Sequence, residues 1–104
     1  MARKDRTIAI GQARAALIVA ATRRTLLTYG ELGLALGLDG VALRNELRHV
    51  LDDLSTDCIE RDEPSLAALV INKDTGEPGS GWRDGPGITW HEEVRACFNY
   101  WQPV

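Results

Sequence analysis

A single α+β domain is the fold class that this sequence predicts, on three observations. The chain has 104 residues, a length that suits one hydrophobic core. Helical periodicity runs through the first half of the chain and returns near its end, whereas residues 65–72 form a short apolar run after Pro64. With 44% hydrophobic and 26% charged residues, the composition is that of a globular protein rather than a disordered one. Residues 1–104 are therefore expected to form one domain, with residues 1–10 as a flexible N-terminal arm.

Two helices are predicted in the first part of the chain. Residues 12–28 are rich in Ala and Leu, follow Gly11 and contain no proline, which favours a first helix. The stretch YGELGLALGL at 29–38 has helical spacing, and Gly37 is a typical helix end. The side chains expected to face the core are Leu17, Ala20, Ala21 and Leu27 from the first helix, and Leu32, Ala35 and Leu36 from the second.

The third predicted helix, from Val41 onward, has the cleanest amphipathic spacing. Five of its apolar residues fall at i, i+4, i+7, i+8 and i+11 and are expected in the core: Leu43, Leu47, Val50, Leu51 and Leu54. The opposite face carries Arg44, Asn45, Arg48 and Asp52. The helix fades into a polar segment, and Pro64 prevents its continuation.

A strand, a hairpin and a last helix are predicted after Pro64. Residues 65–72 are apolar on both alternating sets, which favours a buried strand. The next segment, KDTGEPGSG at 73–81, is rich in turn residues and suits a β-hairpin. In the final segment Thr89 precedes Glu92 by three residues, as in a helix capping box. The inward face of this helix is expected to consist of Trp90, Val94, Cys97, Phe98 and Trp101.

The predicted order of elements is that of a winged helix-turn-helix domain. It consists of three helices followed by a strand, a glycine-rich hairpin and a C-terminal helix. A generic α+β domain could share this order, so the pattern is an analogy of fold and does not establish a function.

The charges are divided unevenly along the chain. Residues 1–48 contain eight Lys and Arg against four Asp and Glu, a balance of +4, whereas residues 49–104 contain four against eleven, a balance of −7. The formal net charge of −3 argues against simple coating of nucleic acid. One basic and one acidic face are the expectation, and either could be a docking surface.

Four features of the sequence resemble the winged-helix domain of the alkylguanine-DNA alkyltransferases and the alkyltransferase-like proteins. They are the segment TYGELGLALGL, the segment LRNEL with Arg44, Pro64 before an apolar strand, and DTGEPGSGW after that strand. The resemblance covers roughly residues 26–82. It implies that Tyr29 matches the family's tyrosine that contacts DNA phosphate or displaces a base. It also implies that Arg44 matches the arginine inserted into the duplex.

The chain departs from this family at the residues that carry the chemistry. Where the family has Pro-Cys-His-Arg-Val, the chain has Pro64, Ser65, Leu66, Ala67 and Ala68, so the alkyl-accepting thiolate and its histidine are missing. Cys58 lies among acidic residues, which would raise its pKa and disfavour a thiolate nucleophile. Alkyl transfer, and enzymatic activity in general, is therefore not expected. Binding of a base or lesion without chemistry remains compatible with the sequence.

No cofactor or metal ion is expected. Two cysteines and two histidines, without a CxxC motif, are too few for a usual structural zinc site. Cys58 and Cys97 are interpreted as apolar core residues in a reducing, cytoplasmic location, although a disulfide between them is also compatible with the sequence. The apolar run at 13–21 is too short to span a bilayer, so no membrane partner is expected.

Two functional hypotheses follow. The first is a non-enzymatic winged-helix protein that binds duplex DNA, as in transcription regulation, through Tyr29, Arg44, Asn45, Arg48, Lys73 and Arg83. Its third helix would lie in the major groove, and its hairpin would contact the DNA backbone. The alternative is a small protein-binding module, such as an inhibitor, adaptor or immunity-like protein, whose acidic C-terminal half binds a basic protein. Under that alternative, the charged face of the third helix is an ordinary solvated surface.

Overall fold

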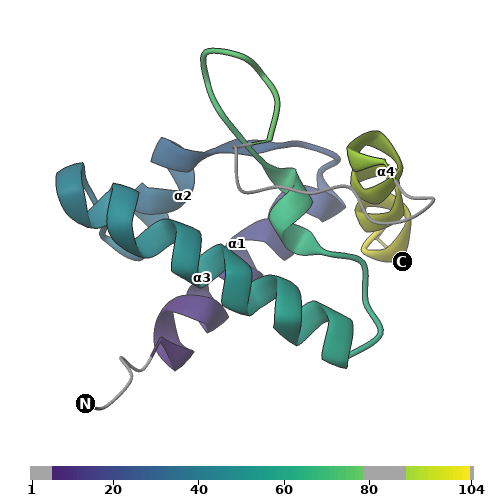
Figure 1. Cartoon of the computed structure of the whole chain (residues 1–104). Helices are drawn as coiled ribbons and strands as arrows, with labels where there is room; N and C mark the ends of the chain where they lie inside the picture. The colour runs from purple at the N-terminus through teal and green to yellow at the C-terminus, as the bar shows by residue number, and fades with distance from the viewer. Residues whose placement is uncertain (1–5, 79–88, 104) are drawn as a thin grey trace.

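The computed structural model describes residues 6–78 and 89–103, apart from the side chain of Arg44. In chain order these residues form α1 (Thr7–Thr22), β1 (Leu27–Thr28), α2 (Tyr29–Leu36), α3 (Gly40–Glu60), the 3₁₀ helix η1 (Leu66–Leu69), β2 (Val70–Ile71) and α4 (Trp90–Tyr100). The helices surround a core over which β1 and β2 pair (Figure 1). The described part is thus mostly helical with a small two-stranded sheet, which is compatible with the predicted α+β fold class.

The first helix begins and ends earlier than the sequence predicts. Residues 7–10 of the expected flexible arm belong to α1, and the Ile10 amide donates to the Arg6 carbonyl at 2.8 Å. Gly11 was expected to precede the helix but lies inside it, because Ala9 and Ile10 pack on the core and outweigh the low helix propensity of glycine. The helix stops at Thr22, where Arg24 takes a left-handed φ of 53° and the Thr25 amide bonds to the Ala20 carbonyl at 2.9 Å. Leu27 therefore lies on a strand and not on the helix.

The second helix has its predicted bounds. Thr28 and Glu31 form a capping box, with the Glu31 amide 3.1 Å from Thr28 Oγ1 and the Thr28 amide 2.9 Å from Glu31 Oε1. At the other end Gly37 has a φ of 72°. Leu32 is buried as expected, but Ala35 is exposed, and the small residue that faces the core beside Leu32 is Gly33.

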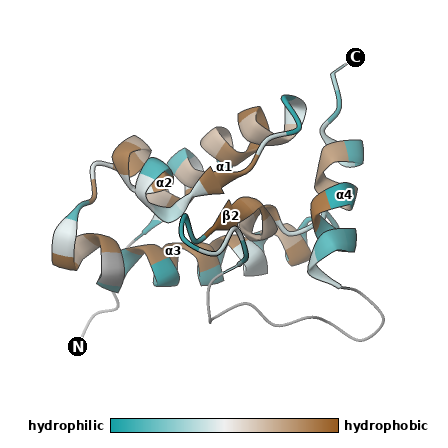
Figure 2. Ribbon diagram, turned by 90° about the horizontal axis from the view of Figure 1, so that it is seen from above, coloured by the Kyte–Doolittle hydropathy of each residue, from teal (hydrophilic) through white to brown (hydrophobic). Residues whose placement is uncertain are grey.

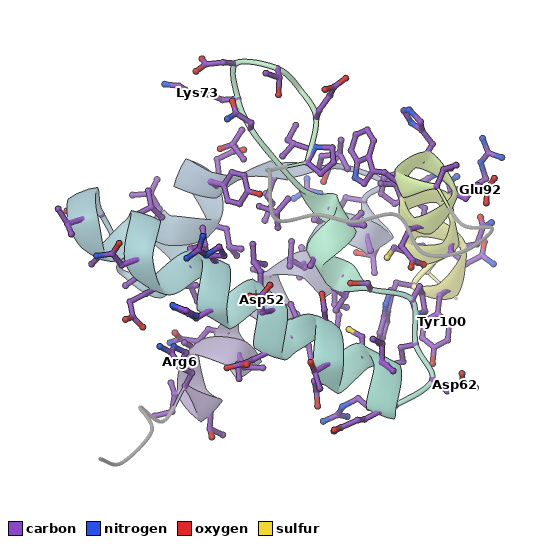
Figure 3. The ribbon with its side chains drawn as sticks, in the orientation of Figure 1. Arg6, Asp52, Asp62, Lys73, Glu92 and Tyr100 are labelled. Atoms are coloured by element: carbon purple, nitrogen blue, oxygen red, sulfur yellow. The ribbon has the colours of Figure 1, made fainter. Side chains whose placement is uncertain are left out.

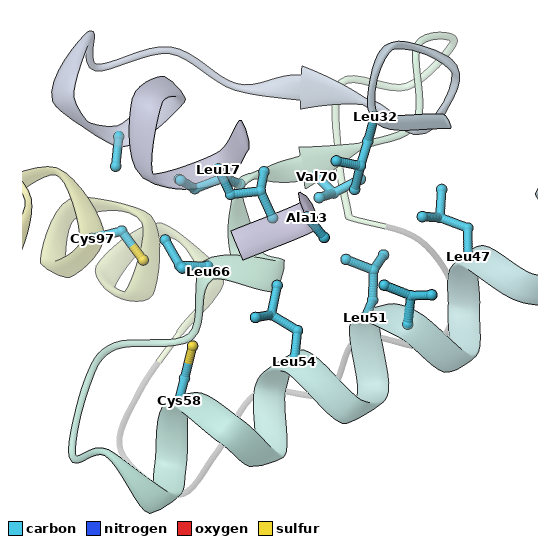
Figure 4. Packing of buried hydrophobic residues seen from close by; sticks show 13 residues of the cluster. Ala13, Leu17, Leu32, Leu47, Leu51, Leu54, Cys58, Leu66, Val70 and Cys97 are labelled. Carbon is cyan, nitrogen blue, oxygen red and sulfur yellow. The ribbon is translucent and has the colours of Figure 1, made fainter. Parts of the chain in front are cut away.

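The third helix is confirmed and runs for 21 residues, further than the hydrophobic spacing alone indicates. Leu47, Val50, Leu51 and Leu54 are buried and Leu43 is partly buried, so the predicted phase of this helix is correct. The helix continues through the polar segment after Leu54 because Cys58, two residues from its end, is also fully buried. Figure 4 shows Leu51 and Leu54 projecting from α3 toward Ala13 and Leu17 of α1.

The predicted long strand at 65–72 is wrong for most of its length. Residues 66–69 form η1, and only Val70 and Ile71 are extended. A 3₁₀ turn buries Leu66, Ala68 and Leu69 as completely as a strand would, so the apolar run did not distinguish the two. Within the described residues β2 pairs with β1, parallel and in the register Leu27–Val70 and Thr28–Ile71. The returning strand of the expected hairpin falls on residues 79–88, which lie outside the described part.

The terminal helix has the Thr89 half of the predicted capping box and most of the predicted inward face. The Glu92 amide donates to Thr89 Oγ1 at 3.3 Å, and Cys97 is fully buried with Val94, Phe98 and Trp101 packed beside it. Trp90 anchors the start of α4, because its indole N–H donates to the Ala68 carbonyl at 2.8 Å. Coloured by hydropathy, the facing sides of α1, α3 and β2 are mostly brown (Figure 2).

A mostly buried ionic cluster joins α1 to the end of α3 and to α4. Arg14 Nη2 donates a hydrogen bond to Glu63 Oε2 at 3.0 Å, Nη1 lies 2.7 Å from Oε1, and the guanidinium lies 5.5 Å from the Trp101 ring centroid. The hydrogen bond to Glu63 raises the pKa of Arg14. Because the two residues are 49 positions apart, this contact could not be read from the sequence.

Two glycine substitutions should affect stability in opposite directions. A Cβ at Gly33 would collide with the Leu43 side chain and lie 3.1 Å from the Leu38 carbonyl, whereas a Cβ at Gly11 meets nothing within 4 Å. We expect Gly33→Ala to lower the free energy of unfolding by about 1–3 kcal/mol, and Gly11→Ala to raise it by about 0.5–1 kcal/mol. Urea unfolding followed by circular dichroism measures both, and a Gly33→Ala protein as stable as the parent would contradict the close contact.

Candidate functional site

The corner between α2 and α3 sets the position of the candidate site. Gly33 allows α2 to contact Leu43 directly, and the Leu38 amide donates to the Gly33 carbonyl at 2.8 Å. Gly37 and Gly40 both have positive φ, 72° and 54°, so the chain reverses within three residues between the helices. A short connection therefore joins α2 to α3, and the first half of α3 projects from the corner between them (Figure 1).

The solvent side of this half of α3 carries the predicted polar residues. Asn45 and Arg48 are exposed, as expected from the amphipathic phase. Arg44 lies in α3, but its side chain is outside the described part of the structure. Val41, one turn before Asn45, is 65% exposed and completes this face. Guanidinium and carboxamide groups on an exposed helix can donate hydrogen bonds to phosphates and base edges.

Glu46, the acidic residue next to Asn45 in the sequence, forms an ion pair with Arg6. Glu46 Oε2 lies 3.2 Å from Arg6 Nε, and the two side chains are only 23% and 14% exposed. This ion pair joins the start of α1 to α3 across 40 residues and offsets the negative charge of Glu46. The next acidic residue on the exposed side is Asp52, one turn beyond Arg48.

Tyr29 and Lys73 lie at the same end of the sheet. Because β1 and β2 are parallel and in register, the residues that follow them, Tyr29 and Asn72, leave the sheet side by side. Tyr29 packs partly against the core and so also has a structural role. Lys73 is exposed on a loop that Asn72 closes by bonding to the Asp74, Gly76 and Glu77 main chains. Arg83 lies outside the described residues.

The predicted site residues therefore form two groups. Arg44, Asn45 and Arg48 are on α3, and Tyr29 and Lys73 are where α2 and the 72–77 loop leave the sheet. In Figure 3 Lys73 lies on the α2 side of the molecule, whereas Asp62 and Glu92 lie on the other side, toward α4. The exposed Asp74 and Glu77 add negative charge to the loop that carries Lys73.

The second half of α3 and the turn after it are acidic. Asp57 is paired with Arg61 at 3.1 Å and Glu63 with Arg14, whereas Asp52, Glu60 and Asp62 are exposed. Ile59 lies among them and is 73% exposed. Sequence reasoning identified the negative charge of this region but not the exposed Ile59, because isoleucine was not expected on the solvent side of an amphipathic helix.

Ser65, the residue after Pro64, lies in a polar cluster. Its hydroxyl is 3.0 Å from the Ser55 hydroxyl, and its carbonyl accepts a hydrogen bond from the Cys97 thiol at 3.2 Å. Partial burial raises the pKa of nearby Glu93, an effect opposed by a hydrogen bond from the Ser65 backbone. A second hydroxyl is a poor general base, so the Ser55–Ser65 contact does not activate Ser65 as a nucleophile.

Both cysteines are free and fully buried, as their interpretation as core residues predicted. Burial raises the pKa of Cys97 to about 12. Burial also raises the pKa of Cys58, more than the neighbouring Glu63 and Asp57 do, while Arg14 opposes the shift. The predicted direction for Cys58 is confirmed, but its main cause is burial rather than acidic neighbours.

Three residues of the candidate site were not identified from the sequence. Arg6 was grouped with the flexible arm, and its partner Glu46 is too distant in the chain for a local rule to connect them. Val41 and Leu34, 65% and 80% exposed, flank the corner as apolar surface. The helical spacing of Val41, Asn45 and Arg48, at i, i+4 and i+7, could have identified Val41 as part of the same face.

Within residues 6–78 and 89–103, no group of three or more His, Cys, Asp and Glu side chains could hold a metal ion. None of the helices in this part is long and apolar enough to cross a bilayer. Comparison of the chain with protein-family models, with curated proteins and with solved structures finds no match.

The buried thiols should make stability depend on alkaline pH. In the folded protein the pKa of Cys97 is raised to about 12 from an ordinary value of 9.0, so between these values only the unfolded chain releases the proton. We expect the free energy of unfolding to fall across this window by up to about 1.4 kcal/mol per pH unit.

Urea unfolding at pH 8, 9, 10 and 11 measures this slope in the parent protein and in Cys97→Ala. The variant keeps the other groups that titrate in this range, so its slope should be shallower. Parallel slopes for the two proteins would show that Cys97 does not carry the effect.

Proposed function

We propose that the protein is a non-enzymatic, winged-helix-like protein that binds duplex DNA, as a regulator of transcription does. The first half of α3 enters the major groove, and the 72–77 loop contacts the DNA backbone. One observation carries this proposal: the exposed side of α3 from Val41 to Arg48 presents Asn45 and Arg48, while Glu46 is held by Arg6.

The α2–α3 corner supports this docking mode. In helix-turn-helix proteins the N-terminal residues of the second helix contact base edges, and the first helix crosses the backbone. α2 and α3 have this order, a three-residue connection and a direct contact at Gly33. Tyr29 at the start of α2 and Lys73 on the adjacent loop would then contact the phosphate backbone beside the groove.

The net charge of −3 limits the expected affinity. Few cations are available on the proposed face, so electrostatic binding should be weak at physiological salt and clear only at low salt. The acidic half of α3 would point away from the duplex and would disfavour other orientations.

A salt series with labelled random-sequence duplex, read by fluorescence anisotropy, tests the proposal. With about three phosphate contacts, the logarithm of the binding constant should fall with the logarithm of salt concentration with a slope of about −3. Arg48→Ala should weaken binding by about 1–3 kcal/mol.

Arg95→Ala is the matched control, because Arg95 is an exposed arginine on α4, remote from the α2–α3 corner. It removes the same charge and should change the affinity less than twofold. No binding at 20 mM salt, or equal weakening by both substitutions, would refute the proposed function.

The second candidate function is a module that binds a basic protein. It is favoured by Ile59, exposed among Glu60, Asp62 and the neighbouring carboxylates at the end of α3. Exposed apolar surface surrounded by charge is typical of protein interfaces. A protein that fails to bind duplex but binds a lysine-rich amphipathic peptide, with loss of binding in Ile59→Ser, would favour this candidate.

A further inference from the structure

Three exposed residues of α3 form a row with distinct chemistry. Val41, Asn45 and Arg48 lie at i, i+4 and i+7, so they share one face of the helix over about 10 Å along its axis. Base pairs are stacked about 3.4 Å apart, and the row is thus about three base-pair steps long. Each residue can face a different base pair when α3 lies in the major groove.

Asn45 is suited to recognise adenine. Its carboxamide carries both a donor and an acceptor, which match the adenine N7 acceptor and N6 amino donor at the major-groove edge. Asn45 is exposed, and among the described residues no hydrogen bond occupies its carboxamide. Forming two hydrogen bonds to a base therefore requires no internal bond to be broken.

Val41 is suited to contact a thymine methyl group. It is 65% exposed in the first turn of α3, and Leu34 on the α2 side of the corner is 80% exposed. The C5-methyl group of thymine is the apolar feature of the major-groove edge, and apolar side chains discriminate it from cytosine, which lacks it.

Two carboxylates on α3 bear on what the row can contact. Glu46, next to Asn45, is engaged by Arg6, so it is not available to accept a hydrogen bond from the cytosine amino group. Beyond Arg48, the exposed Asp52 would repel the backbone phosphates. The row therefore ends at Arg48, which can donate to a phosphate.

From this row we infer that the protein selects A·T base pairs through the major groove, with Asn45 on adenine and Val41 on a thymine methyl group. The inference rests on the proposed function and adds the class of DNA that is recognised. It makes Asn45 and Val41 the residues that determine specificity, while Arg48 contributes affinity.

Four duplexes of equal length test this inference at low salt, by fluorescence anisotropy. The first is an A·T-rich duplex, and the second has the same sequence with deoxyuridine in place of thymidine, which removes only the methyl groups. The third is a G·C-rich duplex, and the fourth replaces its guanine with hypoxanthine. The fourth has the major-groove acceptors of G·C but the minor groove of A·T, because the guanine amino group is absent.

We expect the A·T duplex to bind most tightly. The deoxyuridine duplex should bind about fourfold more weakly for each methyl group contacted. The hypoxanthine duplex should bind with the same affinity as the G·C duplex. Asn45→Ala should bind the deoxyuridine and G·C duplexes equally, because neither then offers a group that the variant can select, and Val41→Ala should bind the thymidine and deoxyuridine duplexes equally. Both side chains are exposed, so thermal unfolding should confirm that the variants are folded.

Equal binding of all four duplexes, with Arg48→Ala still weakened, would overturn the inference and leave the proposed function standing. Tight binding of the hypoxanthine duplex would also overturn it, because the selectivity would then come from the minor groove. Absence of binding to any duplex would overturn the proposed function and the inference together.

Discussion

The close contact of α2 with α3 at Gly33 is the constraint on which the rest of the structure depends. Because residue 33 has no Cβ, Leu43 can pack directly against α2, and the chain can reverse through Gly37 and Gly40 with positive φ. This corner fixes the phase of α3. With Leu47, Val50 and Leu54 committed to the core, Asn45 and Arg48 have no position but the surface. The core-packing face and the candidate binding face are therefore opposite sides of α3.

The sequence predicted the elements whose boundaries have a local signal. α2 was placed correctly because its apolar residues have helical spacing and Gly37 takes the left-handed position at its end, although the capping box of Thr28 and Glu31 at its start was not predicted. The ends of α1 and α3 were missed because Arg24 and Asp62, which seldom adopt a left-handed φ, take the equivalent positions. The 3₁₀ turn at 66–69 and the parallel pairing of β1 with β2 depend on contacts between distant segments, which periodicity does not report.

The part of the candidate site that depends on local sequence was also predictable, and the part that depends on tertiary contacts was not. Asn45 and Arg48 follow from the amphipathic spacing of α3, and their exposure confirms it. The pairing of Glu46 with Arg6, which offsets the negative charge next to Asn45, required the fold to bring together residues 40 positions apart. The Arg14–Glu63 cluster at the other end of α3 is likewise a tertiary contact.

Chemical-shift mapping by ¹⁵N–¹H NMR during titration with duplex DNA at low salt tests the central claim most directly. It reports on each backbone amide and needs no substitution. The account predicts that the largest changes lie in residues 29–51, on the exposed side of α2 and the first half of α3, and in the 72–77 loop. Changes confined to residues 57–63 and α4, or no changes at saturating DNA, would contradict it.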